Sequence, residues 1–124
     1  MNWKFTADRP VYQQIMAAIR GSVLKGELKP GEKVPSGRDL AAQARVNPNT
    51  MQRAMTELER EGLLVGAGTS GRTVTTDEEI LASIKKQTLT ELARECAEQF
   101  LVFGITPSQA AQLLLALEGE TEER

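Results

Sequence analysis

Histidine is absent from this sequence of 124 residues, and cysteine occurs once, as Cys96. A single cysteine excludes an intrachain disulfide, and the lack of histidine excludes a Cys/His zinc site and every His-based acid/base or triad mechanism. We therefore expect no metal site, no cofactor and no enzymatic activity. We interpret Cys96, which lies among apolar residues at helical spacing, as a packing residue.

Long apolar runs are also absent. No run approaches the ~20 residues that a membrane helix needs, and the N-terminus, MNWKFTADRP, lacks the apolar stretch of a signal peptide. The expected location is cytoplasmic, with no membrane partner. With 40% hydrophobic and 26% charged residues, the composition is that of one modest globular domain with an extension.

The overall formal charge of −2 conceals an imbalance between two parts of the chain, each of which has fewer charges of one sign than of the other. Residues 1–76 contain 11 Lys and Arg against 7 Asp and Glu, a net charge of +4, whereas residues 77–124 contain 4 against 10, a net charge of −6. Chance alone can produce such an imbalance in a short chain. The imbalance favours a first part that binds a polyanion and a second part with another task.

The stretch from Asn47 to Leu58 separates apolar and polar residues at helical spacing. Its apolar positions follow an i, i+3, i+4, i+7 pattern at Met51, Ala54, Met55 and Leu58, which predicts the buried face of a helix. Asn47 is a good N-cap, Pro48 suits the first helical position, and Gly62 can end the helix in a left-handed conformation. The opposite face carries amide, hydroxyl and guanidinium groups, which read base edges and contact phosphates in DNA; for an isolated helix, an ordinary solvated face is the alternative.

Two further helices precede this stretch. The apolar spacing from Val11 to Leu24 predicts a core helix that begins at Pro10 and ends at Gly26, and residues 2–6 are predicted as a short edge strand. Ser36 is a candidate cap for a helix of about two turns. A short helix, a tight turn at Arg45 and Val46, and a longer helix form a helix-turn-helix arrangement, in which the second helix enters the major groove.

Two β-prone runs follow, residues 63–65 and 72–75, and a glycine-rich segment, residues 66–71, separates them. The glycines follow a helix and lead into a strand, which is the reverse of a nucleotide-binding loop. A hairpin at this place is the wing of a winged helix, with Gly71 letting the backbone approach DNA and Arg72 reaching a phosphate or the minor groove.

Three segments, residues 10–15, 28–41 and 46–54, resemble the winged helix-turn-helix domain of the GntR family of bacterial transcription regulators. The Asn47 to Thr50 segment and the short C-terminal part are similar to the YtrA subfamily. The resemblance implies DNA contacts from Arg38, Asn47, Pro48, Asn49, Thr50, Gln52 and Gly71, and we add Arg45, Arg53 and Arg72 as phosphate-binding cations. Many relatives carry Lys or Arg where this chain has Ala67 and Gly68, and arginine where it has Pro48, so the reading of bases depends on fewer side chains.

Residues 77–124 are predicted to form two helices, one from about Asp77 to Phe103 and one that Thr106 caps with Gln109. Their apolar surface exceeds what two helices can cover, so we infer homodimerisation through Ile84, Leu92, Cys96, Phe100, Phe103, Leu113, Leu114 and Leu117. A self-contained helical hairpin on a monomer is the alternative. Residues 118–124 are expected to form an acidic, frayed tail.

The predicted fold is mainly α with a small β-hairpin: a winged helix-turn-helix domain over residues 1–76, followed by a short two-helix dimerisation segment over residues 77–124. The predicted function is sequence-specific binding of double-stranded DNA at an inverted repeat by a homodimer. Repression, and control of a transporter operon, are implied by the family resemblance, and activation remains open. A winged helix that binds only proteins is the competing class, and a small-molecule effector at the dimer interface also remains open.

Overall fold

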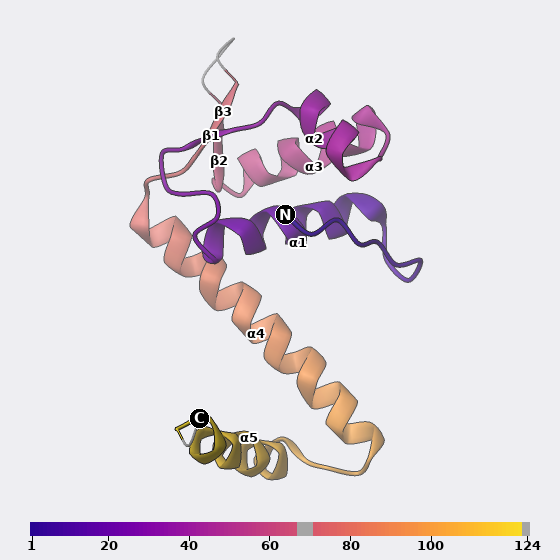
Figure 1. Cartoon of the computed structure of the whole chain (residues 1–124), viewed down its shortest axis with the longest axis vertical. Coiled ribbons are helices and arrows are strands. Elements are labelled where there is room, and N and C mark those ends of the chain that lie inside the picture. The colour runs from indigo at the N-terminus through magenta and orange to yellow at the C-terminus, as the bar shows by residue number, and fades with distance from the viewer. Residues whose placement is uncertain (67–70, 123–124) are drawn as a thin grey trace. The chain divides into compact units, whose positions relative to one another are not determined.

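The computed structural model describes residues 1–66 and 71–122 of the chain. Its elements, in order, are α1 (Val11–Leu24), β1 (Lys33–Val34), α2 (Gly37–Ala44), α3 (Pro48–Arg60), β2 (Leu64–Gly66), β3 (Arg72–Val74), α4 (Glu78–Val102) and α5 (Pro107–Glu122) (Figure 1). The chain forms two compact units, Met1–Lys85 and Lys86–Arg124. A mainly helical fold with a small β-hairpin is therefore confirmed.

The core of the first unit is built where α1, α2 and α3 pack together (Figure 1). All four apolar residues predicted for the inner face of α3, from Met51 to Leu58, are completely buried, as are Ile15 and Ile19 of α1 and Leu40 of α2. Complete burial of a Met, Leu or Ile side chain contributes roughly 1.5–3 kcal/mol. This packing fixes which face of α3 remains exposed.

Side chains at the helix ends behave as the sequence predicts. The Asp39 N–H donates to the Ser36 Oγ at 3.1 Å, and the Asn49 N–H donates to the Asn47 Oδ1 at 2.7 Å. Pro48 occupies the first turn of α3, and Gly62, with φ of 88°, follows its end. Local chemistry therefore sets the start of α2 and both ends of α3.

A three-stranded antiparallel sheet closes the first unit, with the strand order β1-β3-β2. The β2–β3 hairpin, which we call the wing, was predicted. The pairing of β1 with β3, which aligns Lys33 with Thr73, was not. Residues 2–6 form no strand, contrary to the prediction; Trp3 and Phe5 instead pack their side chains against the core.

The start of α4 belongs to the first unit. Ile80 and Leu81 pack against the core, and Ile84 is only 5% exposed within it. The structural division therefore falls after Lys85, further along the chain than the boundary expected after residue 76.

In the second unit, Thr106 and Gln109 form a reciprocal capping box. The Gln109 N–H donates to the Thr106 Oγ1 at 3.2 Å, and the Thr106 N–H donates to the Gln109 Oε1 at 2.9 Å. Helix α5 continues to Glu122, so the frayed tail predicted from residue 118 is wrong as far as residue 122. Among the described helices, none by itself is long and apolar enough to cross a bilayer; α4 and α5 meet that test only as a pair bent by 107°.

Candidate nucleic-acid interface

The turn between α2 and α3 is held in an uncommon backbone conformation. Arg45 has φ of 58° and ψ of 47°, in the left-handed region, and the Val46 N–H donates to the Ala41 carbonyl at 3.1 Å. This conformation ends α2, and the chain enters α3 after three residues. The Arg45 side chain is exposed beside the start of α3.

The N-terminal end of α3 presents polar groups to solvent. Asn47, Pro48, Asn49 and Gln52 are exposed, and Thr50 is half-buried. The Asn47 Oδ1 accepts the capping bond from the Asn49 N–H, and its amide nitrogen remains a donor at this surface. Amide groups in this position can donate to and accept from base edges in a major groove.

Helix α2 begins directly against the same part of α3. A Cβ added to Gly37 would lie 3.2 Å from the Gln52 Oε1 and 3.3 Å from the Met55 Sδ. Arg38 is the next residue along and is exposed. The fold therefore brings the start of α2 and Gln52, which are 15 positions apart in the sequence, into one surface region.

Arg53 stacks on a residue that the sequence analysis did not single out. Its guanidinium carbon lies 3.8 Å from the centroid of the Tyr12 ring of α1, a cation–π contact. Tyr12 lies in the first turn of α1 and is half-buried. The only signal in the sequence was its place in the first of the three segments that resemble the GntR family.

The Arg72 side chain contacts other residues of the protein. It forms an ion pair with Glu59 of α3, its Nη1 lies 3.8 Å from the Met55 Sδ, and its side chain is 18% exposed. The contact between Arg72 and DNA, predicted from the sequence, does not fit this geometry. Arg72 instead connects the wing to α3, and we remove it from the proposed DNA contacts.

Gly71 and Lys33 lie next to each other on the exposed side of the wing. Gly71 has φ of 91°, and a Cβ added there would lie 3.7 Å from the Lys33 Cε. The sequence analysis gave Lys33 no role, because its strand was not predicted to join the wing. The substitution of basic residues by Ala67 and Gly68, noted in the sequence, falls outside the described residues.

Charge on α3 is arranged along its length. Its three acids, Glu57, Glu59 and Glu61 at the C-terminal cap, form ion pairs with Arg60, Arg72 and Arg20, respectively. Within the described residues, Arg38, Arg45 and Arg53 form no ion pair. Positive charge therefore stays unbalanced toward the N-terminal end of α3, where a polyanion would be attracted.

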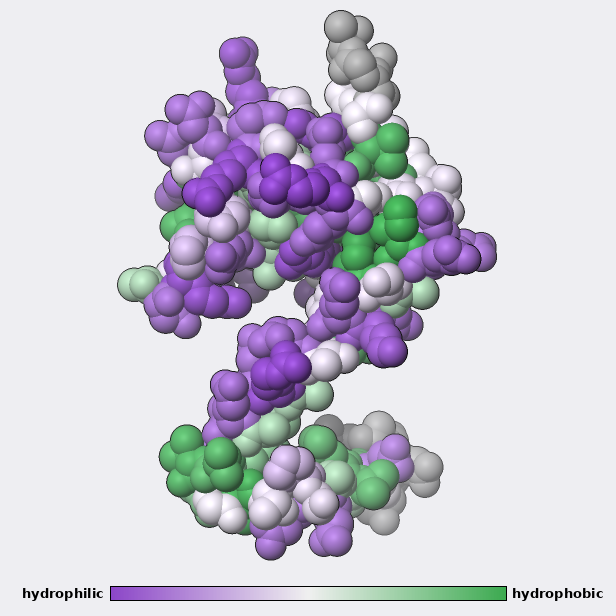
Figure 2. Space-filling model, turned by 180° about the vertical axis from the view of Figure 1, so that it is seen from behind, coloured by the Kyte–Doolittle hydropathy of each residue, from purple (hydrophilic) through white to green (hydrophobic). Residues whose placement is uncertain are grey.

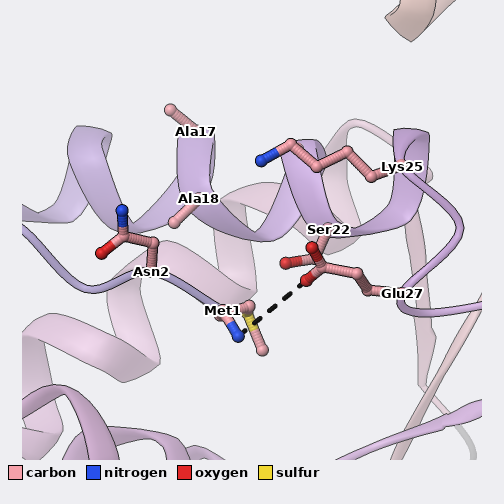
Figure 3. A pocket seen from close by; sticks show the side chains of 8 residues that line it. Met1, Asn2, Ala17, Ala18, Ser22, Lys25 and Glu27 are labelled. Atoms are coloured by element: carbon pink, nitrogen blue, oxygen red, sulfur yellow. Dashed lines mark ion pairs between the residues drawn. The ribbon is translucent and has the colours of Figure 1, made fainter.

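Two further features of the first unit are a carboxyl group with a lowered pKa and a pocket. The Thr6 hydroxyl donates to Asp8 and lowers the pKa of that carboxyl below its usual value. A pocket of about 420 Å³ lies between the N-terminal segment and α1, where the Met1 ammonium is 3.9 Å from Glu27 (Figure 3). In the parts of the chain that the structure describes, no group of His, Cys, Asp or Glu side chains is arranged to hold a metal ion.

The residues assigned to dimerisation fall into two groups. Ile84 is buried in the core of the first unit and is not available to a partner, so we remove it from that surface. In the second unit, Leu92, Phe103, Leu113, Leu114 and Leu117 are at least half exposed, and Cys96 and Phe100 are half-buried. Figure 2 shows apolar surface exposed on this unit.

The first unit has three helices, of which α2 and α3 form a helix-turn-helix, and a β-hairpin directly follows α3. This arrangement defines a winged helix-turn-helix protein. The chain belongs to the GntR family: residues 11–74 match the profile described as "Bacterial regulatory proteins, gntR family". It is 33% identical over 109 residues to the uncharacterized HTH-type transcriptional regulator YhcF of Bacillus subtilis, covering 88% of this chain and 90% of YhcF. It is 47% identical over 58 residues to the repressor YtrA of the same organism, covering 47% of this chain and 45% of YtrA.

Solved structures agree with this assignment. A GntR family regulator from Listeria monocytogenes superposes with a TM-score of 0.80 at 26% identity, covering 90% of this chain and 98% of that one. The DNA-binding domain of AraR, in complex with operator ORX1, superposes with a TM-score of 0.56 at 25% identity, covering 60% of this chain and 96% of that one. The chain is therefore a GntR family transcriptional regulator, similar to members of the YtrA group.

Proposed function

We propose that this protein is a cytoplasmic, homodimeric repressor that binds an inverted-repeat operator. The observation that carries the proposal is the exposed polar and cationic end of α3, with Gln52 beside the start of α2 and three arginines without ion pairs in the described residues. The operator complex of the AraR DNA-binding domain supports this use of the fold. Repression is proposed because the chain is similar to the transcriptional repressor YtrA. Control of a transporter operon is the most specific form of the proposal.

Each part of the surface has a proposed role. Asn49, Thr50 and Gln52 read bases, with the Asn47 amide nitrogen and the Pro48 ring adding contacts. Arg38, Arg45 and Arg53 bind phosphates, which positions the protein without sequence preference. The backbone at Gly71 approaches the DNA. The second unit joins two copies, whose α3 helices reach half-sites about one helical turn apart or a multiple of that.

The proposal is tested with two substitutions at exposed positions of the first unit. Arg38→Ala should weaken binding to all duplexes alike and reduce the salt dependence of the affinity, because it removes a phosphate contact. Gln52→Ala should change the preferred sequence, recovered by in vitro selection, while the salt dependence stays the same. Fluorescence anisotropy at roughly 50 to 300 mM salt, a range that spans physiological ionic strength, measures the affinity and its salt dependence for both variants. Unchanged binding in both variants would contradict the assignment.

The second candidate, a winged helix that binds only proteins, is favoured by one observation, the mixed polar character of the exposed α3 face. The same titration separates the two. Binding of the wild-type protein to a mixed-sequence duplex that falls steeply with salt supports DNA binding, and no binding at low salt supports the protein-interaction module.

A further inference from the structure

Lys33 and Arg72 occupy opposite faces of the small sheet. Successive residues of a strand point to opposite sides, so Arg72 on β3 points toward α3, where it meets Glu59, while Thr73 points outward. Lys33 aligns with Thr73 across the β1–β3 pair and is exposed. Of these two cations of the sheet, Arg72 is therefore held against the protein, and Lys33 extends into solvent.

The Lys33 side chain also extends along the wing. Its Cε lies 3.7 Å from the place where a Cβ would be at Gly71, and the ammonium is one further bond away. A glycine lets a backbone approach a neighbouring molecule more closely than other residues do. A phosphate that approaches Gly71 would therefore lie within a few ångströms of the Lys33 ammonium, and no ion pair to Lys33 occurs among the residues that the structure describes.

We propose that Lys33, on the strand β1 beside the wing, is the cation that contacts a DNA phosphate there, and that Arg72 instead holds the wing against α3 through Glu59. This inference rests on the proposed function, because it specifies a contact of the same interface. Lysine suits the task, since its ammonium is a compact charge on a flexible stem that follows a phosphate without fixed geometry. Arg72, paired and mostly covered, would have to give up Glu59 before it could do the same.

The test compares charge removal at two exposed lysines of the first unit. Lys33→Gln should reduce the affinity for a mixed-sequence duplex about five- to tenfold near 0.1 M salt. It should also make the negative slope of log K against log salt shallower by about 0.9, the value for one phosphate contact. Lys33→Arg should restore both. Lys25→Gln, at the exposed end of α1, removes the same charge and should leave the slope unchanged.

Arg72→Gln completes the comparison. It should lower the thermal midpoint, which Lys33→Gln should leave unchanged, because of these two residues Arg72 alone forms an ion pair among the residues that the structure describes. A wild-type slope in Lys33→Gln would overturn the inference, as would a slope in Arg72→Gln lowered by about 0.9 with an unchanged midpoint. If Lys33→Gln has no effect while Arg38→Ala lowers the slope, the inference fails and the proposed function stands. If the wild-type protein shows no salt-dependent binding, both fail.

Discussion

Gly62 and Gly26 share a backbone conformation but differ in their surroundings. Their φ angles are 88° and 84°, a region that favours glycine. A Cβ added to Gly62 would lie 3.0 Å from the Ile80 Cδ1, where α4 packs against the end of α3, whereas a Cβ added to Gly26 would meet nothing within 4 Å. The pair therefore separates the cost of the backbone conformation from the cost of packing.

We expect Gly26→Ala to lower the free energy of unfolding by roughly 1–2 kcal/mol, the cost of a left-handed conformation for an L residue. Gly62→Ala should lower it by more, because Ile80 must also move. Urea denaturation followed by circular dichroism measures both values. Equal losses would mean that Ile80 moves aside without cost.

At the scale of elements, α1 and α3 are joined at the protein surface as well as in the core. The stacking of Arg53 on Tyr12 fixes a side chain of α3 by a contact from α1, which lies outside the helix-turn-helix. Exposed cation–π contacts contribute about 0.5–1 kcal/mol. An arginine held in this way loses less conformational freedom when it binds a phosphate.

Tyr12→Leu should therefore weaken DNA binding about two- to fivefold, which corresponds to loss of the 0.5–1 kcal/mol of the cation–π contact that orients Arg53. Tyr12→Phe should keep wild-type affinity. In an Arg53→Ala background, Tyr12→Leu should have no additional effect. A double-mutant cycle measured by anisotropy at fixed salt checks the coupling. The same loss in both backgrounds would show that Tyr12 acts independently of Arg53.

At the scale of the whole molecule, the proposed dimer depends on apolar surface of the second unit. Leu92 is 60% exposed and Leu114 is 50% exposed, and Phe103, at 81%, is more exposed still. Contiguous exposed apolar surface marks an interaction site in most proteins. A carboxylate introduced at the centre of such an interface loses its hydration without gaining a partner.

Leu92→Glu combined with Leu114→Glu should convert the dimer to a monomer in sedimentation velocity experiments. It should also weaken binding to a duplex with two half-sites by at least about tenfold, as expected when linked binding is lost, while binding to a single half-site is unchanged. Gln112→Glu, an exposed polar position of α5, is the matched control and should remain dimeric. A wild-type protein that sediments as a monomer would overturn the proposed dimer.

Much of the fold could be predicted because its determinants are local. The caps at Ser36, Asn47 and Thr106 depend on residues two or three positions away, and the buried stripe of α3 depends only on the period of the helix. The proposed reading residues, such as Gln52, were chosen from that same local pattern. Their place at the N-terminal end of α3 follows from the helix period and the cap.

The tertiary structure alone decided which distant groups meet. The strand that contains Lys33 pairs with β3, about 40 positions later, and its two residues carried no strand pattern of their own. Arg72 looked like a cation available to DNA until Glu59 was placed beside it, and Ile84 looked like part of a dimer surface until the core was placed around it. The sequence gives the hydropathy and charge of each residue and the periodic pattern that it forms with its neighbours. An ion pair or a buried contact also requires a partner that is distant in the sequence, and only the folded chain brings that partner near.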